Sequence, residues 1–289
     1  MFDAGAPALF VFLWSTGWIS ARYAADDADA LTFLSWRYAF AGIALLAFVQ
    51  ISRAAWPTTR AAGVHAMISG VLLHGIYLGG VWWALRHGVP TGISGVIAAL
   101  QPILTAFLAP LLIAERISPL RWLGVVLGFA GIVVVLSPKV MAMEAGTLAT
   151  TLEPLAVNVV GMLSVTLGTF YQKRFVATGD LRTITFLQYV GAFAFTLPMA
   201  LYFEKGVMHV TPTLVLTMVW SVFALSIGAI ALSLVMIRRG AVSRFAALIY
   251  LVPPTVAVEA WLLFGETLTP VQVAGMALTV AGVALATRK

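Results

Sequence analysis

The chain has 289 residues, of which 61% are hydrophobic and only 10% are charged, and its formal net charge is +6. Its mean hydropathy of +1.00 is too high for a water-soluble domain of this length and predicts a membrane protein. The positive charge therefore does not indicate nucleic-acid binding. The absence of cysteine excludes disulfides and thiol catalysis.

Ten apolar runs are long enough to cross a bilayer, whose apolar core is about 30 Å thick and needs roughly 20 residues per helix. Short polar or Pro/Gly breaks separate them. No Lys or Arg precedes the first run, so we interpret it as a helix and not as a cleavable signal. We predict an all-α membrane protein with transmembrane helices at residues 6–25, 30–52, 63–85, 89–114, 119–137, 154–172, 182–203, 213–237, 242–264 and 269–287.

The basic residues other than Arg37 are unevenly distributed between the two membrane sides. If the N-terminus is cytoplasmic, the cytoplasmic side holds Arg53, Arg60, Arg116, Arg121, Lys173, Arg174, Arg182, Arg238, Arg239, Arg244, Arg288 and Lys289. The other side holds only Arg22, Arg86, Lys139 and Lys205. This bias favours an even number of helices with both termini in the cytoplasm.

The two halves of the chain repeat each other. Glu115 and Glu266 are 266 − 115 = 151 residues apart, and the same offset relates Pro102 to Pro253, Pro119 to Pro270, Gly124 to Gly275 and Gly131 to Gly282. Each half holds five helices, an odd number, so the second half enters the membrane from the opposite side. We predict inverted-topology repeats at 1–137 and 154–289, joined by a loop at 138–153.

A Glu-x-x-Ser/Thr-Pro element precedes the last helix of each half. Ser118 and Thr269 are suited to cap these helices, with a proline at the first helical position. Glu115 and Glu266 lie on opposite membrane surfaces in the predicted topology, so they cannot contact one substrate together. We interpret the element as a tight helical hairpin, and a gating role for the two glutamates is the alternative.

The five-plus-five duplication, the Glu…Pro…Gly…Gly element closing each half, and LWSTGWISARYA followed by FLSWRYAFAG resemble the EamA-type branch of the drug/metabolite transporter superfamily. The resemblance covers essentially the whole chain and extends to aromatic amino-acid exporters of that branch. It implies a secondary transporter, often an exporter of amino acids or related metabolites. It also implies that helices one, three, four, six, eight and nine line the path, with five and ten at the edges or in a dimer.

Two prolines at equivalent positions, Pro102 and Pro253, fall near the centres of the predicted fourth and ninth helices. A proline inside a helix removes a backbone donor and frees a carbonyl one turn earlier. Matched interruptions in two halves are a sequence pointer to a transport site. The alternative is a pair of tolerated kinks.

Several side chains near the predicted bilayer centre are suited to a mostly aromatic pocket with a few hydrogen-bonding groups. The candidate substrate-binding residues are Trp14, Trp18, His74, Tyr77, Gln101 and Tyr250. Trp14 and Trp18 share one helix face at i, i+4 spacing. For each aromatic residue the alternative is packing or an interfacial belt, whereas a midplane imidazole needs a partner or a function.

Two full charges, Arg37 and Glu259, lie inside predicted helices. Charges at this depth pair with one another or face water. We expect the two to form an ion pair, or both to face a water-filled vestibule. Alternatively, Arg37 contacts a substrate carboxylate and Glu259 binds a coupling proton.

The residues give little support to other functional classes. Gly92-Ile93-Ser94-Gly95 matches an intramembrane serine protease motif, but the only later histidine, His209, falls in an outer loop. There is no His-Glu-x-x-His zinc motif and no phosphate-binding loop, so we expect neither an enzyme nor a bound cofactor or metal. A channel needs a filter sequence, which is absent, and a scaffold has no need of matched prolines.

We therefore predict a secondary active or facilitative transporter that moves small metabolites by alternating access. Amino acids, in the export direction, fit best; other amphiphilic metabolites or drugs, or a pore, are the alternatives. The expected partners are the small-molecule substrate and the lipid bilayer, with no nucleic acid. The expected working unit is a monomer or homodimer in the cell's inner (cytoplasmic) membrane.

Overall fold

The computed structural model describes residues 2–89, 91–114, 117–141, 152–239, 247–265 and 269–287. The helices in this part of the chain are α1 (Phe2–Ala25), α2 (Ala30–Ile51), α3 (Arg60–Gly70), η1 (Val71–Ile76), α4 (Tyr77–Arg86), α5 (Thr91–Ile113), α6 (Pro119–Met141), α8 (Leu152–Phe175), α9 (Leu181–Phe203), α10 (Pro212–Trp220), η2 (Ser221–Ala229), α11 (Ile230–Arg239), η3 (Ile249–Leu251), α13 (Val252–Phe264) and α14 (Pro270–Thr287). Here η1 and η2 are π-helices and η3 is a 3₁₀ turn.

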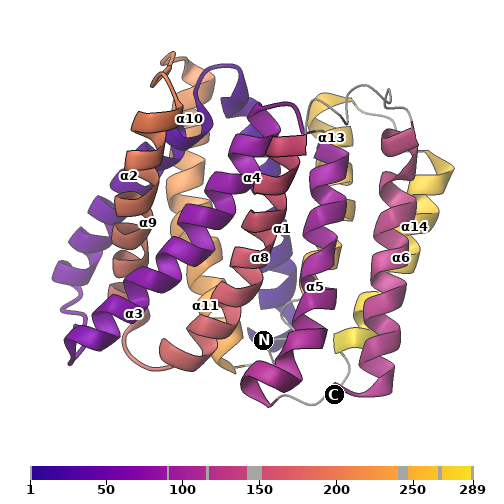
Figure 1. Cartoon of the computed structure of the whole chain (residues 1–289), viewed down its shortest axis with the longest axis horizontal. Coiled ribbons are helices and arrows are strands. Elements are labelled where there is room, and N and C mark those ends of the chain that lie inside the picture. Colours follow the sequence, from indigo (N-terminus) through magenta and orange to yellow (C-terminus); the bar gives the residue numbers. More distant parts are fainter. Residues whose placement is uncertain are drawn as a thin grey trace.

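These elements form ten helical segments, which confirms the predicted all-α architecture. The third segment joins α3, η1 and α4, the eighth joins α10, η2 and α11, and the ninth joins η3 to α13. Five segments are long and apolar enough to cross a membrane by length and composition. Both termini lie toward the lower end of the bundle in Figure 1. We call this end the terminal end and the other the far end.

The helices that close the two halves, α6 and α14, pack directly on each other along one edge of the bundle (Figure 1). A Cβ atom at Gly124 would collide with the backbone around Gly282, and one at Gly131 would collide with the backbone of Gly275. These two contacts are related by the 151-residue offset, because 124 + 151 = 275 and 131 + 151 = 282. The glycines thus permit a close helix contact within one chain.

Each closing helix begins with the predicted cap. Ser118 Oγ accepts a hydrogen bond from the amide of Arg121 at 3.3 Å, and Thr269 Oγ1 accepts one from the amide of Gln272 at 3.3 Å. The Gln272 side chain in turn accepts from the Thr269 amide at 2.9 Å, which completes a capping box. The hairpin interpretation is therefore supported at both positions, while Glu115 and Glu266 lie outside the described residues.

No sequence pattern predicts the two π-helices, which occupy equivalent positions in the two halves. Adding 151 to the bounds of η1, 71 and 76, gives 222 and 227, inside η2. A π-helix uses i→i+5 bonds and so leaves local carbonyls without their usual partners. Two equivalent tyrosines satisfy them: Tyr38 donates to the carbonyl of His74 at 3.0 Å, and Tyr189 donates to that of Ser226 at 3.0 Å.

The two prolines are not equivalent in the structure. Pro102 lies inside α5, as predicted, and its side chain is buried. At Pro253 the ninth segment changes from the η3 turn to α13, which begins at Val252, so the regular helix is interrupted next to this proline and its role in transport stays a prediction. Proline is tolerated in a first helical turn, where the amide has no partner within the helix. The Pro253 side chain itself is outside the described part.

Loops from the two halves meet at each end of the bundle. At the far end, the Glu204 carboxylate accepts from the amides of Leu31 and Thr32 at the start of α2, at 2.8 and 2.7 Å. This arrangement places a negative charge at a helix N-terminus, where it is stabilising. Asp29 accepts from the Val207 amide at 3.0 Å. We call this set the far-end clasp.

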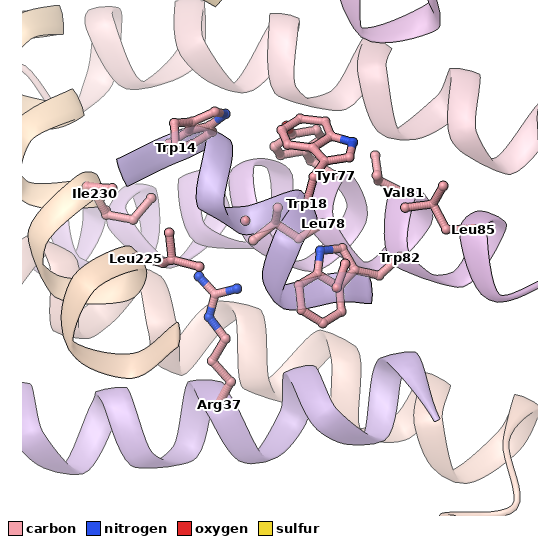
Figure 2. A pocket seen from close by; sticks show the side chains of 13 residues that line it. Trp14, Trp18, Arg37, Tyr77, Leu78, Val81, Trp82, Leu85, Leu225 and Ile230 are labelled. Carbon is pink, nitrogen blue, oxygen red and sulfur yellow. The ribbon is translucent and has the colours of Figure 1, made fainter. Parts of the chain in front are cut away.

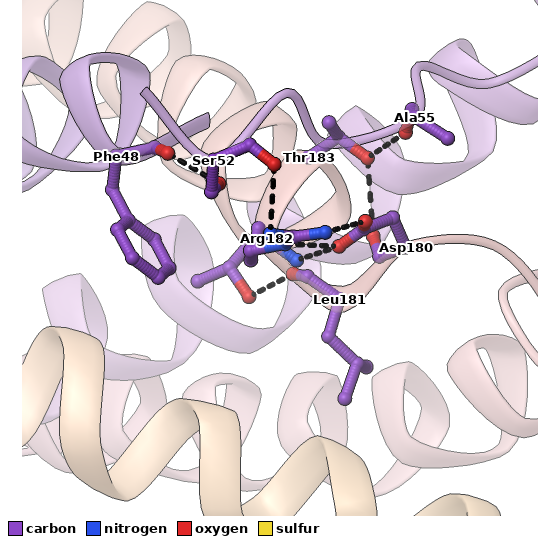
Figure 3. Close-up of polar contacts among 8 residues, drawn as sticks. Phe48, Ser52, Ala55, Asp180, Leu181, Arg182 and Thr183 are labelled. Carbon is purple, nitrogen blue, oxygen red and sulfur yellow. Dashed lines mark hydrogen bonds and ion pairs between the residues drawn. The ribbon is translucent and has the colours of Figure 1, made fainter. Parts of the chain in front are cut away.

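Residue Asp180, which is 151 positions after Asp29, anchors the corresponding terminal-end clasp (Figure 3). Arg182 donates to Asp180 and to the carbonyl of Ser52, and Thr183 donates to the carbonyl of Ala55 at 2.9 Å. Hydrogen bonding from Arg182 lowers the pKa of Asp180 to about 2, from its ordinary 3.8. Both clasps therefore join one half of the chain to the other.

Candidate functional site

A pocket between α1, α2, the third segment and the eighth segment contains most of the predicted aromatic residues (Figure 2). We call it the aromatic pocket, and its cavity has a volume of about 40 Å³. Its principal lining residues are Trp14, Trp18, Arg37, Tyr77, Trp82 and Leu225. Large flat rings beside one cation are suited to an amphiphilic ligand with an anionic group.

Arg37 is the charged group of the aromatic pocket and is only 3% exposed. Its Nε donates to Ser226 Oγ on η2 at 2.8 Å, and its guanidinium points toward the pocket in Figure 2. Among the described residues, no carboxylate forms an ion pair with it. A buried guanidinium without a counter-ion is costly, so this site favours an anionic ligand.

The expected ion pair between Arg37 and Glu259 is not formed. Glu259 is 8% exposed, and its Oε1 lies 2.6 Å from Ser15 Oγ on α1. The physical reason is the helix arrangement, because α13 packs on α1 whereas α2 packs on α9. Glu259 lines neither pocket described here.

A second pocket lies toward the terminal end, and we call it the polar pocket. Its polar lining residues are His74, Gln101, Thr169, Gln172, Gln188 and Ser233. Gln188 donates to Ser69 Oγ at 2.9 Å and to the Gln172 side chain at 3.2 Å. The His74 ring stacks on Tyr189 with centroids 5.0 Å apart, and neither ring nitrogen has a hydrogen-bond partner among the described residues.

The two pockets are related by the duplication. Residues of the aromatic pocket correspond, at the 151-residue offset, to residues of the polar pocket: Trp14 to Val165, Trp18 to Thr169, Ala21 to Gln172, Arg37 to Gln188, Trp82 to Ser233, and Leu225 to His74. Trp14 and Ile230 line both pockets. These two side chains therefore stand between the aromatic pocket and the polar pocket.

The structure brings five of the six predicted binding residues to the pockets. Trp14, Trp18 and Tyr77 line the aromatic pocket, and His74 and Gln101 line the polar one. Tyr250 lines neither, because its ring packs against Gly128 of α6 and is fully buried there. Sequence reasoning missed Gln188, Gln172, Thr169 and Ser233, although the 151-residue offset from the aromatic pocket points to each of them.

The serine of the protease-like motif has a structural partner. Ser94 Oγ accepts a hydrogen bond from Asn158 Nδ2 at 2.8 Å, which ties α5 to α8. His209 lies in the loop at the far end, where its amide donates to the Asp27 carbonyl. No group of three or more metal-binding side chains occurs among the described residues.

Comparison with known proteins decides the family. The model of the EamA-like transporter family matches residues 6–137 and again residues 154–288. The chain belongs to the EamA-like transporter family. The two matches of this EamA-like chain correspond closely to the two halves proposed from the 151-residue offset, and the family consists of transporters and not of enzymes.

Similar proteins span almost the whole EamA-like chain. An uncharacterized transporter, YvbV of Bacillus subtilis, is 24% identical over 98% of the chain and 90% of its own length. A probable amino-acid metabolite efflux pump of Salmonella typhimurium is 22% identical over 95% of the chain and 91% of its own length. A crystal structure with 20% identity superposes with a TM-score of 0.78 over 98% of this chain and 95% of that one. The last comparison supports the fold alone.

Proposed function

We propose that this multi-pass membrane protein is an amino-acid exporter of the cytoplasmic membrane that works by alternating access. The observation that carries the proposal is Arg37, a buried cation that pairs with no described carboxylate and lies in a pocket of tryptophan and tyrosine side chains. A carboxylate is its natural partner, because a guanidinium binds carboxylates with two parallel hydrogen bonds. The rings of Trp14 and Trp18 then contact the apolar part of the ligand.

The pairing of the two pockets supports alternating access. Equivalent residues of the two halves line the aromatic pocket and the polar pocket, and Trp14 and Ile230 separate them. In an inverted repeat, exchanging the conformations of the halves exchanges which end of the path is open. A substrate bound against Arg37 thus leaves past Trp14 into the polar pocket, or arrives by the same route.

The Salmonella relative is named a probable amino-acid metabolite efflux pump, which agrees with the substrate class and direction of this proposal. The pocket chemistry also disfavours substrates with two or three phosphates. Such groups call for several buried Lys or Arg residues, and Arg37 is the only one that lines either pocket among the described residues.

Counterflow in proteoliposomes tests the proposal. Radiolabelled amino acids are supplied outside vesicles that contain the purified protein, with or without excess unlabelled amino acid trapped inside. Saturable uptake that the trapped amino acid accelerates supports a carrier. Absence of flux for every amino acid overturns the substrate class in favour of other metabolites or drugs, and flux that never saturates overturns alternating access in favour of a pore.

A further inference from the structure

Glu259 is a buried carboxyl group that the proposed transport path does not use. It projects from α13 toward α1, where its Oε1 lies 2.6 Å from Ser15 Oγ. Its other oxygen, Oε2, has no hydrogen-bond partner in the described part of the chain. An ionised carboxylate in such a place would keep at most one hydrogen bond, although it has about four acceptor sites.

The geometry around Ser15 accommodates a proton on Glu259. Ser15 Oγ is 2.7 Å from the carbonyl oxygen of Phe12 and 2.6 Å from Glu259 Oε1. A hydroxyl group carries a single proton, and the Phe12 carbonyl can only accept. When Ser15 donates to Phe12, the contact with Glu259 is a hydrogen bond only if the carboxyl group donates. A proton on Glu259 Oε1 completes the chain from Glu259 to Ser15 to Phe12.

No described side chain on a neighbouring element supplies a counter-ion. The helices and turn that pack against α13 are α1, α6 and η3. Their described titratable side chains are Arg22 and Tyr23 on α1, Arg121 on α6 and Tyr250 on η3. None of them forms an ion pair or hydrogen bond with Glu259 in the structure. Asp3 on α1 and Lys139 on α6 have side chains outside the described part.

We infer that Glu259 is a proton-binding site, that it is protonated in this conformation, and that it couples proton movement to the movement of α1. Burial opposes the charged form of a carboxyl group, so the proton can leave only when Glu259 reaches water. The hydrogen bond to Ser15 joins Glu259 to the helix that carries Trp14 and Trp18. Movement of α1 that opens the aromatic pocket therefore breaks this bond and releases the proton to water, and closure takes a proton up again.

Infrared difference spectroscopy tests the protonation directly and requires no substrate. The purified full-length protein in lipid is compared with Glu259→Gln at neutral pH, and Glu153→Gln is the matched control because Glu153 is an exposed carboxyl group. We expect a carbonyl band of a protonated carboxylic acid that Glu259→Gln lacks and Glu153→Gln retains. In Ser15→Ala the band should persist at a shifted frequency. If the wild-type protein shows no band that depends on Glu259, the inference is overturned.

Accumulation driven by a pH gradient tests the coupling, and this part rests on the proposed function. A gradient of one pH unit corresponds to about tenfold accumulation of an amino acid exchanged for one proton. We expect this accumulation in wild type, whereas Glu259→Gln, a neutral side chain of the same shape, should exchange the amino acid without accumulating it. Accumulation by Glu259→Gln equal to that of wild type would overturn the coupling. If no amino acid moves in either protein, the substrate proposal fails, and the infrared band still decides whether Glu259 holds a proton.

Discussion

The aromatic pocket and the polar pocket occupy equivalent positions in the two halves, yet their chemistry has diverged. Where one has Arg37, the other has Gln188, and where one has Trp14 and Trp18, the other has Val165 and Thr169. The repeated half of the chain thus lines two pockets with different side chains, at two depths along the helix bundle. A cation beside large rings holds an amphiphile, whereas neutral amides and hydroxyls offer adaptable hydrogen bonds and no counter-charge.

Under the proposed function, the different chemistry of the two pockets predicts which of them selects the ligand. In the polar pocket Gln188 Nε2 donates to Ser69 and Gln172, whereas Gln188 Oε1 and Gln172 Nε2 have no hydrogen-bond partner among the described residues. Arg37 Nε donates to Ser226 Oγ and the guanidinium also contacts the Tyr189 hydroxyl, yet Arg37 is the one Lys or Arg residue that lines either pocket in the described part of the chain. We therefore expect selectivity to reside in the aromatic pocket and passage to depend on the polar pocket.

The largest effect is expected for Arg37→Gln, which gives the aromatic pocket the residue that the polar pocket has at the equivalent position, Gln188. Charge-assisted hydrogen bonds contribute about 1.5–3 kcal/mol, so apparent affinity for carboxylate substrates should fall about 10- to 100-fold. The measurement is the concentration dependence of counterflow. Arg22→Gln, on the neighbouring helix α1 and outside both pockets, is the control, and monodispersity on size exclusion shows that each variant is folded. Unchanged affinity in Arg37→Gln would mean that Arg37 is structural.

A smaller effect is expected for Trp14→Ala, which removes a side chain that stands between the two pockets. Loss of one aromatic contact with the ligand costs about 0.5–1.5 kcal/mol, so affinity should fall by up to about tenfold. Because Trp14 also separates the pockets, uncoupled leak of substrate should increase. Efflux into substrate-free medium measures the leak. Trp36→Ala, an exposed tryptophan on α2, is the control. Equal behaviour of the two variants would contradict the dividing role.

Gln188→Ala should affect stability more than selectivity. It removes the hydrogen bonds to Ser69 and Gln172, each of which contributes about 0.5–1.5 kcal/mol to the free energy of unfolding. We expect a lower midpoint of thermal unfolding in detergent together with a ranking of amino-acid substrates that stays as in wild type. A changed ranking at unchanged stability would place selectivity in the polar pocket as well.

The smallest effect is expected at the terminal-end clasp, below the polar pocket. Asp180→Ala removes a helix cap that contributes about 1 kcal/mol and a contact with Arg182. Because the pKa of Asp180 is lowered from 3.8 to about 2, the stabilisation is complete above about pH 4 and is lost as the pH falls through 2. Thermal unfolding at pH 7 and at low pH measures it. The difference between wild type and variant should shrink in acid, and a constant difference would contradict the ionic contribution.

The helix pattern could be predicted from sequence, because the length of an apolar run and the Ser118 and Thr269 caps depend on local chemistry. The π-helices could not, since no residue type distinguishes η1 from an ordinary turn. The position of Tyr250 depends on its packing against Gly128, and the absence of an Arg37–Glu259 pair depends on which helices are neighbours. Neither feature depends on the local sequence alone. The polar pocket could have been predicted, because the 151-residue offset leads directly from Arg37 to Gln188.

The central claim is that Arg37 binds the carboxylate of the transported molecule. Its most direct test measures the uptake of a labelled, transported amino acid in the presence of one of two competitors. One competitor is the same amino acid without label, and the other is its carboxamide, which has the same side chain but no negative charge. In wild type the acid should compete at least about tenfold better than the amide, and in Arg37→Gln this preference should disappear. An equal preference for the acid in both proteins would contradict the account.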